Sequence, residues 1–366
     1  MAKELVRSAA GDARRRRARE WLLERGKSAH LLVVAETREA ASSLVRETAR
    51  DLGATFGWER TTLGGLAFAL ASPALALRGL APAGWLSIEA ICDRVVGARG
   101  DDLGRFTPIA DRPGLCRALA RTIGEARMAR LDFSLIGDRD LEDIAADFDR
   151  ELAAAKLADR AVVFSEAIRA AKDRTASHSL LDVPLLVFDA SVTSALARDL
   201  VQAVALRANA VLATLPAGDV QSESFLSAAL SVSPIDLQCD ESTALARAQN
   251  RLFSGEAAAP SSTSKEIEIL SAPGESRECV EVARRILDEA AKGTGFDRMA
   301  IVARSGAPYR AHVVEALRRA KIPAFFARGL MKPDPAGRAL AALLSCAAEC
   351  LSARRFAEYL SLGELP

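Results

Sequence analysis

The sequence predicts an α/β protein built on parallel sheets and interrupted by a long helical segment. Short apolar runs of strand length, such as His30–Ala35 (HLLVVA), Leu185–Phe188 (LLVF) and Ala210–Thr214 (AVLAT), are typical of strands buried on both faces. Helical periodicity follows the first two runs, and this alternation favours a parallel sheet. Strand signals disappear between residues 74 and 179, which predicts a helical insertion.

Composition limits the possible functions. The 366 residues are 50% hydrophobic and 27% charged, which is enough apolar surface for about two to three domains. A net charge of +1 excludes a polybasic protein that holds nucleic acid by bulk charge, and 5% aromatic residues argue against a stacking platform. The six scattered cysteines form no disulfide pattern, and no signal peptide or membrane span is evident. We expect a soluble, cytoplasmic protein with no membrane partner.

The N-terminal elements follow in order. Leu5–Arg7 is strand-like, and a helix is expected from Asp12 to Arg25. The buried strand His30–Ala35 comes next. Thr37–Leu52 repeats apolar residues at helical spacing, and Gly53 is placed as its C-cap. These elements open the first lobe, which we assign to residues 1–73 and 180–254.

The middle of the chain is expected to be all helical. Residues 74–179 contain four helical segments separated by Gly, Pro or Asp: Ser87–Val96, Pro113–Arg130, Asp138–Leu157 and Arg160–Lys172. The α/β pattern then resumes with the strand that ends at Asp189, a helix over Ser194–Arg207 and the strand Ala210–Thr214.

A second α/β lobe is predicted for residues 265–366, after a linker at residues 255–264 that is small, polar and rich in serine. Its expected strands are Glu266–Leu270, Met299–Ala303 and Ala324–Ala327. Its expected helices are Glu275–Ala291, Tyr309–Arg319 and Pro335–Glu349.

The segment after the first strand lies where a phosphate-binding loop would lie. Such a loop needs glycines that let backbone amides face phosphates, a lysine for the β- and γ-phosphates, and a Ser or Thr for Mg²⁺. Here Gly11 is the one glycine retained, and Arg14 and Arg15 stand at the lysine and hydroxyl positions. The nucleotide site is therefore degenerate, and ATP hydrolysis is not expected. The alternative is a divergent ATPase that builds its phosphate site from Arg14 and backbone amides.

Two further positions resemble nucleotide-site elements. Asp189 ends a buried strand, where an acid would hold Mg²⁺ through water. Ala190 and Ser191 follow it instead of a catalytic Glu, so a structural role is favoured. Gly218-Asp219-Val220-Gln221 follows the next strand and fits a sensor loop of helicase motors, or equally a turn in which Asp219 caps the following helix.

The C-terminal segments ESRECVEVARRIL, MAIVARS, YRAHVVEALRRAKIP and AFFARG resemble, in order, the second motor domain of UvrD-type superfamily 1 helicases. Within that group the chain resembles the N-terminal part of the B subunit of AddAB/RexAB-type helicase–nucleases. The resemblance implies two RecA-like (P-loop NTPase-like) lobes, with the second incomplete. It also implies that Arg304 is the motif arginine that reaches nucleotide phosphate, Asp219 and Gln221 the sensor pair, and Asp189 the Mg²⁺-associated acid. The alternative for Arg304 is a solvated arginine at a strand end.

The resemblance also sets the expected cofactors and partners. Relatives carry a PD-(D/E)xK nuclease, but none of the eight lysines here has Asp or Glu two residues before it, so Pro333-Asp334 has no companion. The nuclease metal and an iron–sulfur cluster are expected only in a missing C-terminal part, and Cys346 and Cys350 are interpreted as core residues. No cofactor is expected in this chain, because ATP and Mg²⁺ would belong to an AddA-like helicase subunit. DNA is the other expected partner.

Basic clusters supply the candidate DNA contacts. The arginines at positions 14–17 with Arg19 spread around a helix, which favours a solvated helix over a phosphate track. The better candidates are Arg284, Arg285, Arg318, Arg319 and Lys321, although paired arginines usually only solvate a helix. The predicted function is a helicase-like DNA-binding scaffold for double-strand break repair. The alternatives are a divergent ATPase and a purely architectural subunit.

Overall fold

The chain folds into two compact units, Met1–Ile267 and Glu268–Pro366. The computed structural model describes residues 2–27, 29–175, 177–238, 242–252, 266–327, 329 and 335–362. The expected linker at residues 255–264 lies outside these described residues.

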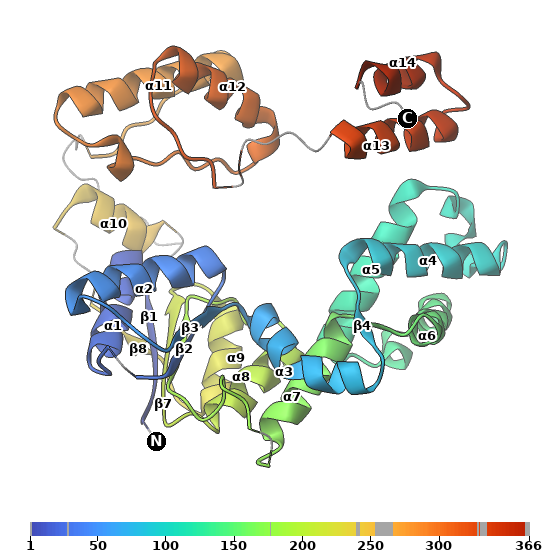
Figure 1. Ribbon diagram of the computed structural model, residues 1–366, viewed down its shortest axis with the longest axis horizontal. Coiled ribbons are helices and arrows are strands. Elements are labelled where there is room, and N and C mark those ends of the chain that lie inside the picture. Colours follow the sequence, from blue (N-terminus) through green and yellow to red (C-terminus); the bar gives the residue numbers. More distant parts are fainter. Residues whose placement is uncertain are drawn as a thin grey trace. The chain divides into compact units, whose positions relative to one another are not determined.

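A six-stranded sheet in which every strand pair is parallel forms the centre of the first unit, in the order β3-β2-β6-β7-β1-β8 (Figure 1). The α/β class with a parallel sheet, predicted from the alternating pattern, is therefore confirmed for this unit. Two strands were missed: β3 is mostly polar and lies at the sheet edge, and β8 is only two residues long. The strands are β1 Ala2–Ser8, β2 Leu31–Ala35, β3 Trp58–Thr61, β6 Leu185–Phe188, β7 Ala210–Pro216 and β8 Ile235–Asp236.

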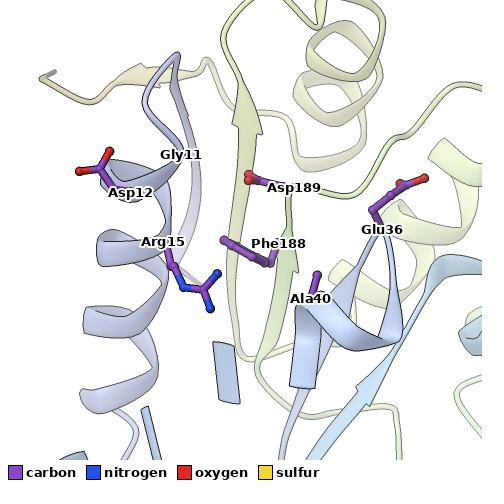
Figure 2. Close-up of a pocket in the computed structure, with 7 residues that line it drawn as sticks. All are labelled: Gly11, Asp12, Arg15, Glu36, Ala40, Phe188 and Asp189. Carbon is purple, nitrogen blue, oxygen red and sulfur yellow. The ribbon is translucent and has the colours of Figure 1, made fainter. Parts of the chain in front are cut away.

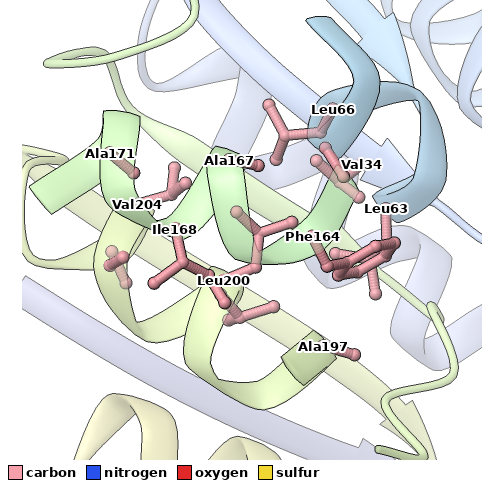
Figure 3. Close-up of a cluster of buried hydrophobic side chains, with 14 of the residues drawn as sticks. Val34, Leu63, Leu66, Phe164, Ala167, Ile168, Ala171, Ala197, Leu200 and Val204 are labelled. Atoms are coloured by element: carbon pink, nitrogen blue, oxygen red, sulfur yellow. The ribbon is translucent and has the colours of Figure 1, made fainter. Parts of the chain in front are cut away.

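Helices cover both faces of this sheet, which is why β2 and β6 are buried along their whole length. Successive residues of β2 point to opposite faces: Val33 packs in the cluster under two helices, and Val34 packs in the cluster under four others. Figure 3 shows part of the second cluster, with Phe164 and Leu200 at its centre. The first pair is α1 Gly11–Leu23 and α2 Arg38–Leu52; the other four are α3 Leu63–Leu77, α7 Arg160–Lys172, α8 Ala195–Ala205 and α9 Val220–Leu230.

The helical insertion has its own hydrophobic cluster, which includes Ile123, Ile144 and Phe148. Two short strands, β4 Ala81–Pro82 and β5 Leu157–Ala158, pair in parallel at its base. Helix α7, which the sequence placed with the insertion, packs instead on α3 and α8 in the sheet-side cluster. The other elements are α4 Trp85–Arg99, η1 Gly104–Ile109, α5 Pro113–Met128, η2 Phe133–Ile136 and α6 Arg139–Ala154, and α10 Ala244–Arg251 follows β8.

Over its described residues, the regular elements of the second unit are all helices, joined by irregular segments. Its elements are α11 Glu275–Ala291, η3 Phe296–Arg298, α12 Gly306–Arg319, α13 Pro335–Ala348 and α14 Ala353–Ser361. The three expected helices are thus present, but the segments 266–270, 299–303 and 324–327 are not strands.

The prediction of a second parallel sheet is therefore not borne out in the described part of the chain. Central parallel strands are buried on both faces, whereas Ile269, Val302 and Phe325 are 94%, 93% and 93% exposed. These segments are apolar in sequence, but their side chains are not buried by neighbouring strands or helices as those of a central strand would be. The buried core of α11 and α12 is small and consists of Cys279, Ala283, Ala316, Leu317 and Ile322.

Candidate functional site

The carboxyl ends of three adjacent strands bring the predicted nucleotide-site positions of the first unit to one sheet edge. Strand β7 lies between β1 and β6, and Ser8 is in register with Pro216 while Phe188 is in register with Thr214. Gly11 begins α1 directly after β1, and Asp189 follows β6. Ligands of open α/β sheets bind in the crevice outside such strand ends, so this edge is the candidate site.

Arg14 lies at the centre of this edge, and its side chain is only 9% exposed. Its Nε lies 3.0 Å from both carboxylate oxygens of Asp189. Its Nη1 donates to the backbone carbonyls of Ser8, at 2.5 Å, and Ala9, at 3.3 Å. The prediction that this arginine belongs to a merely solvated helix is therefore wrong.

A second set of bonds fixes the other side of Asp189. The hydroxyl of Thr214 on β7 donates to Asp189 Oδ1 at 2.7 Å, and the backbone N–H of Asp189 donates back to Thr214 Oγ1 at 3.1 Å. Asp189 has a φ of +45°, in the left-handed region that Asp tolerates better than most residues. The carboxylate is thus held by β7 on one side and by Arg14 on the other, which supports the structural role favoured from the sequence.

Beside this pair lies a pocket of about 450 Å³, shown in Figure 2. Arg15 lines this pocket and binds Glu47 on α2 through Nε and Nη2, both at 2.6 Å. Glu36 accepts a hydrogen bond from the backbone N–H of Ser191 at 2.8 Å. The pocket lining is Gly11, Asp12, Arg15, Glu36, Ala40, Phe188 and Asp189.

These residues do not fit ATP with Mg²⁺. A phosphate loop directs amide N–H groups at the anion, but here the carbonyls of Ser8 and Ala9 face the centre of the loop and bind the guanidinium of Arg14. Asp189, which occupies the position expected for the Mg²⁺-associated acid, is already paired with Arg14. No catalytic step through a nucleotide follows from this geometry.

The predicted sensor pair binds backbone groups. Asp219 Oδ1 accepts from the N–H of Ser222 at 3.0 Å and is the N-cap of α9, as the capping alternative requires. Gln221 Nε2 donates to the carbonyl of Thr193 at 3.0 Å. Ser222, which the sequence did not single out, is fully buried, and its hydroxyl accepts from the N–H of Val192 at 3.0 Å. This bond ties α9 to the loop that follows Asp189.

Helix phase is the signal that would have identified Arg14. The buried residues of α1 are Arg14, Ala18, Trp21 and Leu22, which recur at the i, i+4, i+7, i+8 spacing of one helix face. The arginines at 15, 17 and 19 point elsewhere and pair with Glu47, Glu4 and Asp51. Thr214 carries a weaker signal, as the single hydroxyl in an otherwise apolar strand interior.

The basic candidates of the second unit lie on or next to its helices. Arg318 and Arg319 both pair with Glu315, at 2.9 and 2.6 Å, and their hydrogen bonds lower the pKa of Glu315 to about 2. Arg284 pairs with Glu281 at 3.3 Å, and Arg285 pairs with Glu268. Lys321 follows α12 with a φ of +55°.

Arg304 is exposed in the irregular segment before α12 of the second unit. Cys346 is buried, but Cys350 is exposed, so the prediction that both are core residues is wrong for Cys350. Helix α13 ends at Ala348, before Cys350, and the two cysteines therefore do not share a helix face.

Among the described residues, no three His, Cys, Asp or Glu side chains gather in a way that could hold a metal ion. No helix in the described ranges is long and apolar enough to cross a membrane. No protein-family model matches this sequence, and no curated protein matches it. The geometry and the sequence resemblance are therefore the grounds on which a function is proposed.

Proposed function

We propose that this chain is a helicase-like scaffold subunit that binds DNA, does not hydrolyse ATP, and works with an AddA-like helicase partner in double-strand break processing. The observation that carries the proposal is the ion pair between Arg14 and Asp189, at the sheet edge where a motor lobe would hold nucleotide. The supporting framework is retained, while the groups needed for phosphate and Mg²⁺ are replaced.

The first unit is proposed to be a degenerate RecA-like lobe. Its support is the order of strands at the candidate edge, where the loops after β1, β7 and β6 carry Gly11, Asp219 and Asp189 side by side. Such a lobe serves as a rigid support for the partner's motor. In the proposal, residues 1–73 and 180–254 form this lobe together with α7, and the rest of 74–179 is its insertion.

The second unit is proposed to supply contacts to DNA phosphates, which position a duplex or strand without specifying its sequence. The side chains of Arg318 and Arg319 are 70% and 73% exposed despite their bonds to Glu315. Exposed ion pairs of this kind contribute little free energy, so a phosphate can replace the carboxylate. Lys321, which follows α12, and Arg304 are also exposed in this unit.

The test measures DNA binding by the whole chain, with and without the partner helicase. Fluorescence anisotropy with single- and double-stranded oligonucleotides of random sequence should show binding at low salt that weakens steeply as salt rises. The triple variant Arg284→Ala/Arg318→Ala/Lys321→Ala should weaken binding and reduce the salt slope by about 1 for each phosphate-binding side chain removed. The matched control is Arg94→Ala/Arg117→Ala/Arg121→Ala, which removes three exposed arginines from the insertion. Absence of binding at low salt, even with the partner, would overturn the proposal.

A second candidate, a purely architectural subunit, is favoured by one specific observation. Four of the five proposed DNA-contact residues already pair with carboxylates of their own unit. This candidate predicts a stable complex with the partner in size-exclusion chromatography but no salt-dependent DNA binding. The divergent ATPase is the least supported, because Arg14 is bound to Asp189 and not directed at a free pocket. Measurable ATP turnover by this chain alone would restore it.

A further inference from the structure

We infer that the site at the ends of β1, β6 and β7 is a cradle for a cation, and that the chain fills it permanently with the guanidinium of its own Arg14. This goes beyond the degenerate nucleotide site that the sequence predicts, because it assigns the site a ligand of the opposite charge. The inference concerns the first unit alone and does not depend on DNA binding.

The first step is the polarity of the loop. The carbonyls of Ser8 and Ala9 both accept hydrogen bonds from Arg14 Nη1, so the loop after β1 presents oxygen atoms to its centre. A loop that binds phosphate presents N–H groups instead. Because oxygen atoms repel an anion and bind a cation, this loop selects the opposite charge from the one that a nucleotide would bring.

The second step is the carboxylate. Asp189 faces Arg14 with both oxygens at 3.0 Å from Nε, and its side chain is largely withdrawn from water. A carboxylate in that position requires a cation beside it. Arg14 supplies one, and its planar guanidinium binds through several donors at once.

The third step is what the guanidinium joins together. Through Ser8 and Ala9 it holds the loop after β1, through Asp189 the end of β6, and through the bond between Asp189 and Thr214 the end of β7. These are three adjacent strands of the sheet. A metal ion with its ligands would join the same elements, so Arg14 does structurally what a bound ion would do.

The charges around the pocket support the same assignment. Asp12 pairs with Arg16, and Glu47 pairs with Arg15, which leaves Glu36 as the carboxylate without an opposite charge among these groups. A nucleoside triphosphate would add several negative charges to a set that already holds four carboxylates and three guanidiniums. These are Asp12, Glu36, Glu47 and Asp189, and Arg14, Arg15 and Arg16.

Chemical rescue of the Arg14→Ala variant of the whole chain tests this inference. Removal of the guanidinium leaves Asp189 unpaired, and we expect the thermal midpoint to fall by roughly 10 °C. Methylguanidinium at millimolar, non-denaturing concentration should recover part of that loss, whereas sodium chloride at equal ionic strength and Mg-ATP should not. The control is Arg16→Ala, an exposed neighbour on the same helix, which should show neither the loss nor the recovery.

Several outcomes would overturn the cradle. One is an unchanged midpoint in Arg14→Ala, another is failure of methylguanidinium to raise the midpoint of that variant, and a third is stabilisation of it by Mg-ATP. If the variant does not fold, the unmodified chain still decides the matter: a rise of its thermal midpoint with Mg-ATP contradicts the inference, and an unchanged midpoint is the expected result. None of these readouts involves DNA, so failure here is distinct from failure of the proposed function.

Discussion

Arginines in both units of this protein form ion pairs with carboxylates, but the pairs have different consequences. In the first unit, Arg14 binds Asp189, which is 175 residues away in the sequence, and the guanidinium is almost completely buried. In the second unit, Arg318 and Arg319 bind Glu315, three and four residues away on the same helix, and both stay exposed. The first pair joins distant elements, while the second leaves its side chains available to other partners.

The hydrophobic cores of the two units also differ in how much they bury, and the first unit has the larger core. The first unit buries large side chains on both faces of its sheet, and the second buries only five residues in the cluster between α11 and α12. A site on the first unit therefore rests on a rigid frame. A contact surface on the second unit lies on helices that pack over a small core. The arginines of the two units therefore differ in their burial, which gives Arg14 a structural role and leaves Arg318 and Arg319 free to contact a partner.

The largest expected effect comes from the sheet-side core. Leu200 is fully buried beneath α7, and Leu200→Ala should reduce the free energy of unfolding of the first unit by about 2–5 kcal/mol. Leu317→Ala, in the small cluster of the second unit, should cost less because fewer neighbours surround the cavity. Urea unfolding monitored by hydrogen exchange measures the stability of each unit separately. Equal losses at both positions would break the comparison.

A buried carboxylate of the first unit should come next. Asp159 accepts from the backbone N–H of Val162 at 2.9 Å and from Arg127 Nε at 2.7 Å, with its side chain nearly inaccessible. Asp159→Ala removes a helix cap and a buried pair, and we expect a loss of about 2–3 kcal/mol by urea unfolding. Glu315→Gln on the exposed pair of the second unit is the comparison, and its unfolding midpoint should not move measurably.

Helix caps offer a smaller test. Asp219 caps α9, whereas Ser305 precedes α12 without a side-chain cap bond. Asp219→Ala should therefore cost about 1 kcal/mol, and Ser305→Ala should leave stability unchanged. Asp219→Asn, which keeps the acceptor, should restore most of the loss. A loss of DNA binding by Asp219→Asn at unchanged stability would instead argue for the sensor interpretation.

The smallest effect is a pH dependence confined to α12. The hydrogen bonds from Arg318 and Arg319 lower the pKa of Glu315 from 4.5 to about 2. A depressed carboxyl pKa favours the folded helix above pH 4.5, and this contribution is lost as the pH falls toward 2. NMR titration of the Glu315 carboxyl should show the low pKa, and the Arg318→Ala/Arg319→Ala variant should return it toward 4.5. Titration near 4.5 in the unmodified chain would contradict the pairing.

Much of the first unit could be predicted because a strand buried on both faces of a parallel sheet has a continuous run of apolar residues in its sequence. Strands β2, β6 and β7 are continuous apolar runs, and each was predicted within two residues of its observed bounds. The edge strand Trp58–Thr61 escaped because three of its four residues are polar. A strand at the edge of the sheet is partly exposed and does not need apolar side chains, so its sequence lacks the apolar run that identifies a buried strand.

The same kind of run misled in the second unit. Residues 299–303 read MAIVA, which is as apolar as β7, yet Val302 is almost fully exposed. A strand needs partners that the local sequence does not encode, because ladder bonds and covering helices come from distant segments. The local pattern therefore predicted helices α11 and α12 correctly, because a helix supplies its own backbone hydrogen bonds, and was wrong for the three segments expected to be strands.

The candidate site was predictable only in part, for a similar reason. That Gly11 and Asp189 share a sheet edge follows from their positions after parallel strands. That Arg14 reaches Asp189 does not follow, since four consecutive arginines look alike in sequence. Only the phase of α1, set by Trp21 and Leu22 packing beneath it, distinguishes Arg14 from its neighbours.

The short pairing of β4 with β5 has a consequence for how this architecture can vary. Ala81 stands opposite Leu157, so the chain leaves the sheet-bearing framework and rejoins it at adjacent positions. The C-terminal end of helix α5 makes a second contact with the framework through Met128, and the ion pair between Arg130 and Asp199 follows it. The segment between β4 and β5 also has its own hydrophobic core. The part of the segment beyond α5 can therefore be lengthened or exchanged without changing the spacing of any strand in the sheet, whereas α5 must keep Met128 in the sheet-side core.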